Sequence, residues 1–163
     1  MADCYPDSPA FELETVFGLI EATRMAGVPL LNPALRVEAI GFRRWSPGAA
    51  ETDLAGELWA GVMLTPWFMN LMLLPALPGT LPPVPPGGEI RLALPGGDMP
   101  FLAGHEAGLG HYCLCSLFSP VTEFADQDTA RETALEILRL MFPPPPPAHA
   151  PDLSRRRLFG LGA

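Results

Sequence analysis

The sequence predicts an α+β domain in which an antiparallel sheet of about five or six strands is flanked by an N-terminal helix and a C-terminal helix. Three features of the 163-residue chain support this fold class. Apolar residues recur with helical spacing only near the two ends of the chain. Between them, short apolar runs have the two-residue period of strands. Turns rich in glycine and proline separate these runs closely enough to suggest hairpins and not crossover helices.

The two helices are predicted from their end signals and from their apolar faces. Ser8 is expected to cap the first helix, with Pro9 at the first helical position and Gly27 as its end. Its buried face would hold Leu13, Val16, Phe17 and Ile20. The last helix is expected to begin near Asp126 and to stop at Pro143. Its apolar stripe consists of Ala130, Ala134, Ile137, Leu138 and Met141.

Six apolar runs between the helices are predicted to be strands. They are Leu35 to Phe42, Leu58 to Leu64, Leu71 to Leu74, Ile90 to Leu94, Phe101 to Ala103 and Tyr112 to Phe118. The turn signals between them are Ser46 to Gly48, Pro86 to Gly88, Pro95 to Asp98 and Gly104 to Gly110.

Residues 1–142 are expected to form a single domain that includes a semi-extended, proline-rich loop at 75–88. Residues 143–163 are expected to form a separate tail, in which the polyproline spacer Pro143 to Pro147 leads to a basic, disordered end. No internal repeat is found.

Charge and cysteine content narrow the function classes. Of the 18 acidic residues, 17 precede Pro143, as do only seven of the ten arginines. An acidic body repels phosphate backbones, so nucleic-acid binding is disfavoured and a basic or mixed apolar and basic partner is favoured. Three cysteines and no secretory leader pattern indicate a reducing cytoplasm. The uncharged stretch Leu58 to Pro78 is interrupted by prolines, so we expect buried strands and not a membrane span.

The first candidate site is the aromatic segment that follows the second predicted strand. It contains Pro66, Trp67, Phe68, Met69 and Asn70. Strand alternation would send at least one of the adjacent large side chains away from the core, whichever face is buried. The segment therefore predicts an exposed patch that binds a partner, unless a helix or the proline-rich loop covers all three side chains.

A second candidate segment links the last strand to the last helix. It supplies Ser119, Pro120, Glu123, Phe124 and Asp126. The two carboxylates could form the acidic part of a peptide groove. The alternative is that they only stabilise the positive end of the following helix.

Cys113 and Cys115 form the main chemical cluster, because on a strand their side chains share one face with His111. With His111, and with His105 as a fourth ligand, the two cysteines could hold a soft metal. Alternatively, the two cysteines could form a transient disulfide. The preferred interpretation is that both cysteines are small apolar residues of a half-buried strand. Since no familiar catalytic motif occurs either, we predict no catalytic residues, no metal and no cofactor.

Several of these segments resemble the HybE/HupJ family of nickel-iron hydrogenase assembly chaperones. The matching strings are NPALRVEAIGF at 32–42, LTPWFMNLMLLP at 64–75, GLG at 108–110, CSLFSP at 115–120 and EFAD at 123–126. The similarity runs from about Asn32 to Met141. Two features depart from the family pattern. One is the proline-rich insert that follows Pro75, and the other is Cys113.

The resemblance implies a cytoplasmic accessory protein that is not an enzyme. It would bind the precursor of a hydrogenase large or small subunit before twin-arginine export, and the signal peptide of the precursor is a candidate for the bound segment. The alternative function is a metal- or redox-handling maturation factor that uses Cys113 and Cys115. The tail string SRRRLF at 154–159 is similar to a twin-arginine export signal, so it could mimic the partner. The other interpretation is a plain disordered basic end.

Overall fold

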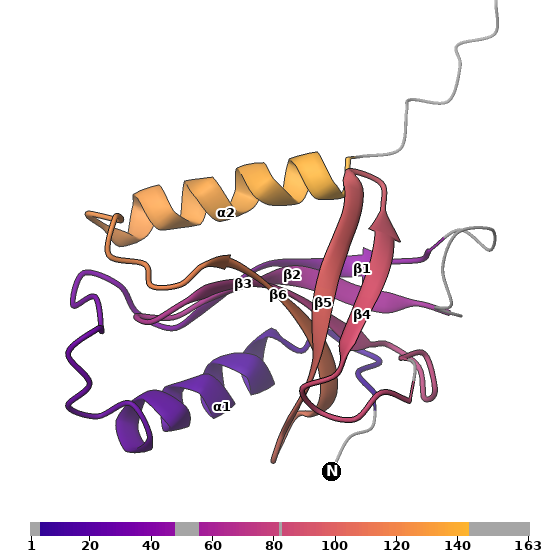
Figure 1. Ribbon diagram of the computed structural model, residues 1–163, viewed down its shortest axis with the longest axis horizontal. Helices are drawn as coiled ribbons and strands as arrows, with labels where there is room; N and C mark the ends of the chain where they lie inside the picture. Colours follow the sequence, from indigo (N-terminus) through magenta and orange to yellow (C-terminus); the bar gives the residue numbers. More distant parts are fainter. Residues whose placement is uncertain (1–3, 48–55, 82, 144–163) are drawn as a thin grey trace, which may run out of the picture.

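The computed structural model describes residues 4–47, 56–81 and 83–143. They form three layers, in which a helix covers each face of a six-stranded antiparallel sheet (Figure 1). The predicted α+β fold is therefore confirmed. The elements are α1 (Ala10–Thr23), β1 (Glu38–Trp45), β2 (Leu58–Leu64), β3 (Met69–Pro75), β4 (Glu89–Leu94), β5 (Gly97–Glu106), β6 (Gly110–Phe118) and α2 (Gln127–Met141).

The strands lie in the order β1-β2-β3-β6-β5-β4. The β4–β5 hairpin therefore occupies the far edge of the sheet, and β6 returns to pair with both β3 and β5. The turn signal at Pro86 to Gly88 consequently does not join two paired strands. The long connection 76–88 leads from β3 to the edge strand β4, and β6 and β5 lie between these two strands in the sheet. It is also less unpacked than predicted, because Ala76 and Thr80 are buried within it.

The limits of β1 and β5 differ from the prediction. β1 starts three residues later than predicted, because Leu35 closes a turn onto Asn32. It continues to Trp45 as an edge strand, where Gly41, at a φ of 64°, adjoins an irregular register. β5 extends well beyond the three residues predicted, since Gly104 stays in the ladder opposite Tyr112.

The helices differ less from the prediction. Asp126 is the N-cap of α2, as its position predicted, and α2 ends at Met141. α1 begins at Ala10, one residue after the predicted start at Pro9. The Ser8 Oγ accepts a hydrogen bond from the Ala10 N–H at 3.4 Å, which is the contact expected of a capping serine. α1 also ends at Thr23, before Gly27. The predicted tail at 143–163 lies outside the described residues, apart from Pro143.

The core has two parts, one on each face of the sheet. Leu71 and Leu73 of β3 pack on the α2 side, whereas Met72 and Leu74 pack on the α1 side. β2 and β3 are consequently buried at every position. The uncharged stretch that starts at Leu58 is thus a pair of buried strands, as predicted. No helix in the described part of the chain is long and apolar enough to cross a membrane.

A charged cluster joins α2 to the start of β1. The Glu38 carboxylate accepts hydrogen bonds from Nε and Nη2 of Arg131, both at 2.7 Å, and from Gln127 Nε2 at 3.1 Å. Two parallel bonds from one guanidinium are among the stronger charge-assisted contacts in proteins. Mainly through these bonds, Arg131 holds the pKa of Glu38 below its usual value.

This cluster predicts a pH-dependent loss of stability. A lowered pKa in the folded chain stabilises it above the ordinary glutamate pKa, and this contribution is lost as the pH falls through the folded value. Across about pH 2 to 7, we therefore expect Glu38→Gln to reduce the free energy of unfolding at neutral pH and to flatten its decline below about pH 5. Urea unfolding across this range measures both effects. Glu136→Gln, which removes a solvent-exposed pair with Arg139, is the control and should follow the wild-type slope.

Candidate functional site

Asn32 joins the two segments that the sequence marked as candidate sites. Its backbone N–H donates to the Pro66 carbonyl at 2.8 Å. Its side-chain Nδ2 donates to the carbonyls of Val121 at 3.0 Å and Phe124 at 2.8 Å. The aromatic segment and the segment after β6 therefore lie side by side at one end of the sheet. The only sequence signal at Asn32 is the turn-forming pair that it makes with Pro33.

Thr65 sets the conformation of the aromatic turn between β2 and β3. Its Oγ1 accepts hydrogen bonds from the backbone N–H groups of Trp67 at 3.3 Å and Phe68 at 3.0 Å. The rings of Trp67 and Phe68 meet edge to face, with their centroids 5.4 Å apart. The Phe68 ring meets the ring of Phe17 in α1 in the same way, with a centroid distance of 5.6 Å. The turn thus holds Trp67 and Phe68 against the side of α1.

The predicted exposed patch is wrong for part of this segment. Pro66, Met69 and Asn70 are buried, and Met69 is fully enclosed on the α2 side of the sheet. Alternation did not send a side chain to solvent, because helices cover both faces of β3. Only Trp67 and Phe68, which are half-buried, present atoms that a partner could touch.

The segment after β6 presents mostly exposed side chains. Ser119, Pro120, Glu123 and Asp126 are exposed, whereas Phe124 is buried against Phe118 with ring centroids 5.1 Å apart. Asp126 Oδ1 accepts a hydrogen bond from the Thr129 N–H at 2.7 Å, and this bonding lowers the pKa of Asp126. Helix capping therefore accounts for Asp126. Glu123 is the exposed carboxylate that a partner could still meet.

The α1 side of the sheet is covered unevenly. One row of paired residues crosses it through Met72, Leu114, Leu102 and Glu89. Met72 is fully buried beneath α1, Leu114 is half-buried, and Leu102 is 45% exposed. Glu89, at the edge, is exposed as well. The cover provided by α1 thus ends at β6.

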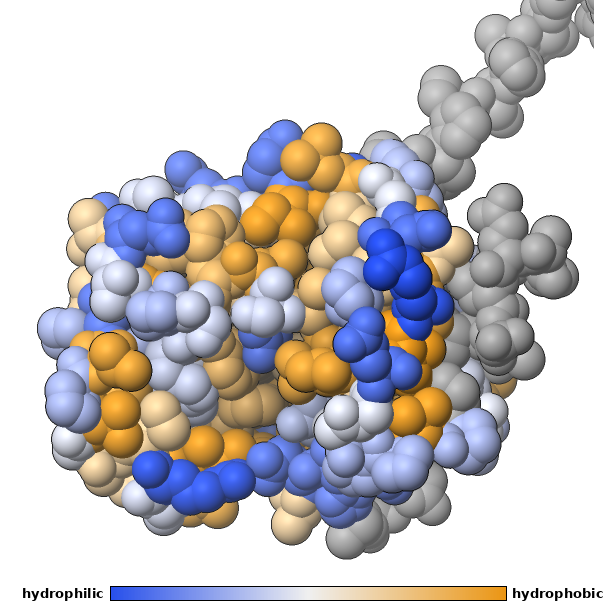
Figure 2. All heavy atoms as spheres, viewed as in Figure 1, coloured by the Kyte–Doolittle hydropathy of each residue, from blue (hydrophilic) through white to orange (hydrophobic). Residues whose placement is uncertain are grey.

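We call the uncovered area the open face and define it by Glu89, Arg91, Leu102, Leu114 and Ser116. A shallow cavity of about 280 Å³ lies there, lined by Glu89, Pro100, Phe101, Leu102, Leu114, Cys115 and Ser116. Figure 2 shows apolar side chains around a hollow between α1 and β6. The open face adjoins the aromatic turn, since Ser116 pairs with Asn70 and Phe68 packs in the same half of the core as Leu114.

Sequence reasoning missed every residue of the open face. The signal that could have found the open face is Leu102, a large apolar residue between Phe101 and Ala103. The side chains of Phe101 and Ala103 are buried on the α2 side of the sheet. Such a position faces outward whenever its neighbours face the core. What the sequence does not contain is the extent of α1, which decides whether an outward residue is covered.

Cys113 and Cys115 lie in the core and not in a reactive site. Cys113 is 2% exposed and Cys115 is also buried, both on the α2 side of the sheet. Burial raises the pKa of Cys113 to about 11 and raises that of Cys115. His111 extends from the same face of β6, as predicted, but it is exposed. Within residues 4–47, 56–81 and 83–143, no three His, Cys, Asp or Glu side chains are placed to share a metal ion.

Thiol alkylation tests this placement. Because the thiolate is the reactive form, a buried thiol with a raised pKa reacts slowly. At mildly alkaline pH we expect iodoacetamide to label Cys4, which is half-buried, well before Cys113. Peptide mass spectrometry of timed samples gives the three rates, and labelling in urea supplies the unfolded reference. Labelling of Cys113 in the native chain at its unfolded rate would contradict the assignment.

Comparisons with known proteins agree with this architecture. The family described as NiFe-hydrogenase assembly chaperone, HybE, matches residues 8–161. Protein HoxT of Cupriavidus necator is 44% identical over 158 residues, with 91% of this chain and 86% of that protein covered. The hydrogenase expression/formation protein HupT of Azotobacter chroococcum is 42% identical, with 84% and 85% covered. The solution structure of HybE from Escherichia coli matches with a TM-score of 0.65 at 25% identity, covering 90% of this chain and 87% of that one.

A family match over nearly the whole chain, similar relatives and a similar solved fold define an assembly protein of the hydrogenase system. The chain belongs to the HybE family of NiFe-hydrogenase assembly chaperones. The resemblance seen in the sequence is thereby confirmed.

Proposed function

We propose that the chain binds the precursor of a NiFe-hydrogenase subunit in the cytoplasm and holds it before twin-arginine export. The observation that carries this proposal is the open face, where α1 leaves the apolar side chains of Leu102 and Leu114 partly uncovered next to Glu89, Arg91 and Ser116. Leu102 is the most exposed large apolar side chain on that face. Exposed apolar areas on small proteins commonly mark partner surfaces.

The half-buried aromatic turn extends this surface towards the end of the sheet. Trp67 and Phe68 are held there by Thr65, so their rings are ordered before a partner arrives. Aromatic residues that are fixed in advance lose little freedom on binding and are common among residues that dominate interface energy. An apolar segment of the precursor would then run along the open face and reach this turn.

The charges around the surface favour a segment that is basic as well as apolar. Glu89 and Arg91 lie at one border of the open face, and Glu123 lies in the loop that Asn32 ties to the aromatic turn, so two carboxylates face one guanidinium there. A twin-arginine signal peptide combines a basic stretch with an apolar one, so it is a suitable client segment. Charge complementarity of this kind speeds encounter and selects partners more than it adds affinity.

The alternative function, metal or redox handling by Cys113 and Cys115, gains no support from the side-chain positions. Both thiols point into the core, and burial keeps Cys113 protonated at neutral pH. In our proposal binding is the whole activity, and the cysteines contribute packing.

Affinity purification of the tagged chain from cells that express the hydrogenase genes tests the proposed function. We expect one subunit precursor to co-purify with its signal peptide still attached, which intact-mass analysis would reveal. Cells that express the same subunit without its signal peptide show whether this segment is needed for capture. If neither the large-subunit precursor nor the small-subunit precursor is recovered from cells shown to contain both, the proposal is contradicted.

A further inference from the structure

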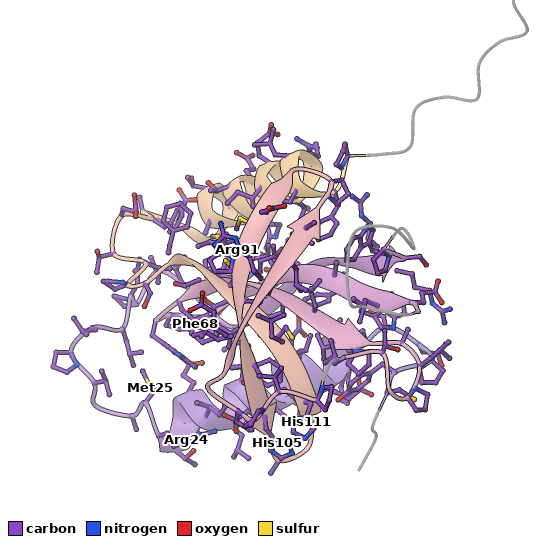
Figure 3. All side chains as sticks on the ribbon, turned by 45° about the vertical axis from the view of Figure 1, so that its right-hand side comes forward. Arg24, Met25, Phe68, Arg91, His105 and His111 are labelled. Carbon is purple, nitrogen blue, oxygen red and sulfur yellow. The ribbon has the colours of Figure 1, made fainter. Side chains whose placement is uncertain are left out.

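Two exposed histidines lie opposite each other near the end of the β5–β6 hairpin. His105 of β5 pairs directly with His111 of β6 in the antiparallel ladder. Their ring centroids are 4.7 Å apart, with an angle of 61° between the ring planes. Figure 3 shows both side chains together at this end of the hairpin. Neither residue belongs to the open face.

The pair has the spacing that a chelating site needs. Directly opposed residues of an antiparallel pair have Cβ atoms about 4.5 to 5.5 Å apart and extend on the same side of the sheet. Both imidazoles are at the surface, so their rings can turn until one nitrogen of each points to a common atom. The paired strands hold the second imidazole near the first, which raises its effective concentration at a bound ion.

The surroundings leave the other coordination positions free. His111 borders a cavity of about 630 Å³, which is otherwise lined by residues of the predicted proline-rich loop such as Pro75, Leu81 and Val84. The adjacent acidic residue, Glu106, is engaged elsewhere, because its carboxylate accepts a 2.7 Å hydrogen bond from Arg24. Among the residues that the structure describes, two therefore serve as ligands at this site, and water or the side chain of a bound molecule completes the coordination.

We propose that His105 and His111 form a surface site for a first-row transition-metal ion. Imidazole nitrogen suits nickel, copper, zinc and iron, whereas magnesium prefers oxygen ligands. With two ligands from the chain, binding is reversible, and a chelator removes the ion. This site is independent of the proposed client surface, and it does not involve Cys113 or Cys115.

The test uses the full-length chain without a histidine tag and nickel chloride as the probe. Isothermal titration calorimetry should show one bound Ni²⁺ per chain, with affinity lower for Mn²⁺ and no competition from excess Mg²⁺. His105→Ala and His111→Ala should each weaken Ni²⁺ binding at least about tenfold, because a single imidazole cannot chelate. His149→Ala removes the third histidine of the chain and serves as the matched control, with unchanged affinity expected.

A spectroscopic measurement locates the ion independently of affinity. Ni²⁺ is paramagnetic, so it should broaden the backbone amide signals at the ends of β5 and β6 in the wild-type chain and leave those of α2 sharp. Circular dichroism of each variant checks that the fold is retained. The proposal is overturned if both alanine variants bind Ni²⁺ as the wild type does, if His149→Ala alone abolishes binding, or if broadening centres on another part of the chain.

Discussion

Leu102→Arg should lower the affinity for the hydrogenase precursor at least about 30-fold, which corresponds to about 2 kcal/mol. Leu102 is the exposed centre of the open face, and a guanidinium there would have to lose its water when an apolar segment docks. The fold should tolerate the change, because the side chain is already 45% exposed and the arginine stem can lie along the strand. Titration of fluorescently labelled precursor against each variant measures the affinity.

Leu140→Arg is the matched control, since Leu140 is 64% exposed on α2, on the opposite side of the sheet. It introduces the same charge and should leave precursor affinity unchanged. Leu102 gives a cleaner test than Phe68, because Phe68 packs on Phe17 and its truncation would also disturb the core. Equal loss in both arginine variants would attribute the effect to charge alone.

Asn32→Ala should reduce the free energy of unfolding by about 2 to 4 kcal/mol. The substitution removes both Nδ2 hydrogen bonds and leaves the carbonyls of Val121 and Phe124 without their donor in a buried place. It also releases the loop after β6 from the aromatic turn, so precursor affinity should fall as well. Urea unfolding, with the midpoint and slope compared with the wild type, measures the loss of stability.

Asn32→Asp separates the two roles of this side chain. Aspartate keeps the acceptor for the Ala34 N–H, which Asn32 Oδ1 binds at 2.9 Å, but it cannot donate to the two carbonyls. If the two hydrogen bonds from Asn32 Nδ2 to the loop after β6 contribute most, Asn32→Asp should destabilise the chain at least as much as Asn32→Ala. Near wild-type stability of Asn32→Asp would show that Asn32 acts only on its own turn.

The parts of the fold that the sequence predicted are those encoded locally. The apolar stripe of α2, its capping Asp126 and its end near Pro143 are all contained in one short segment. Leu58 to Leu64 forms β2 with the predicted limits. The strand order was not predicted, because the placement of β6 between β3 and β5 depends on pairing between segments that are distant in the chain.

The candidate site was predicted only in part for the same reason. Trp67 and Phe68 were found from their chemistry, and the structure leaves both partly accessible. Strand alternation predicts that at least one of Trp67, Phe68 and Met69 leaves the core, but Met69 is enclosed because α1 and α2 cover both faces of the sheet there. The open face escaped prediction because it exists only where α1 stops covering the sheet, and this boundary is a tertiary feature.

Site-specific photo-crosslinking tests most directly whether the open face holds the precursor. A photoreactive amino acid is placed at Leu102 in one version of the chain and at Leu140 in another, and each is irradiated with the purified precursor. Our account predicts a crosslinked product from Leu102, mapped by mass spectrometry to an apolar segment of the precursor, and little product from Leu140. Crosslinking from Leu140 with none from Leu102, in a complex shown to form, would contradict it.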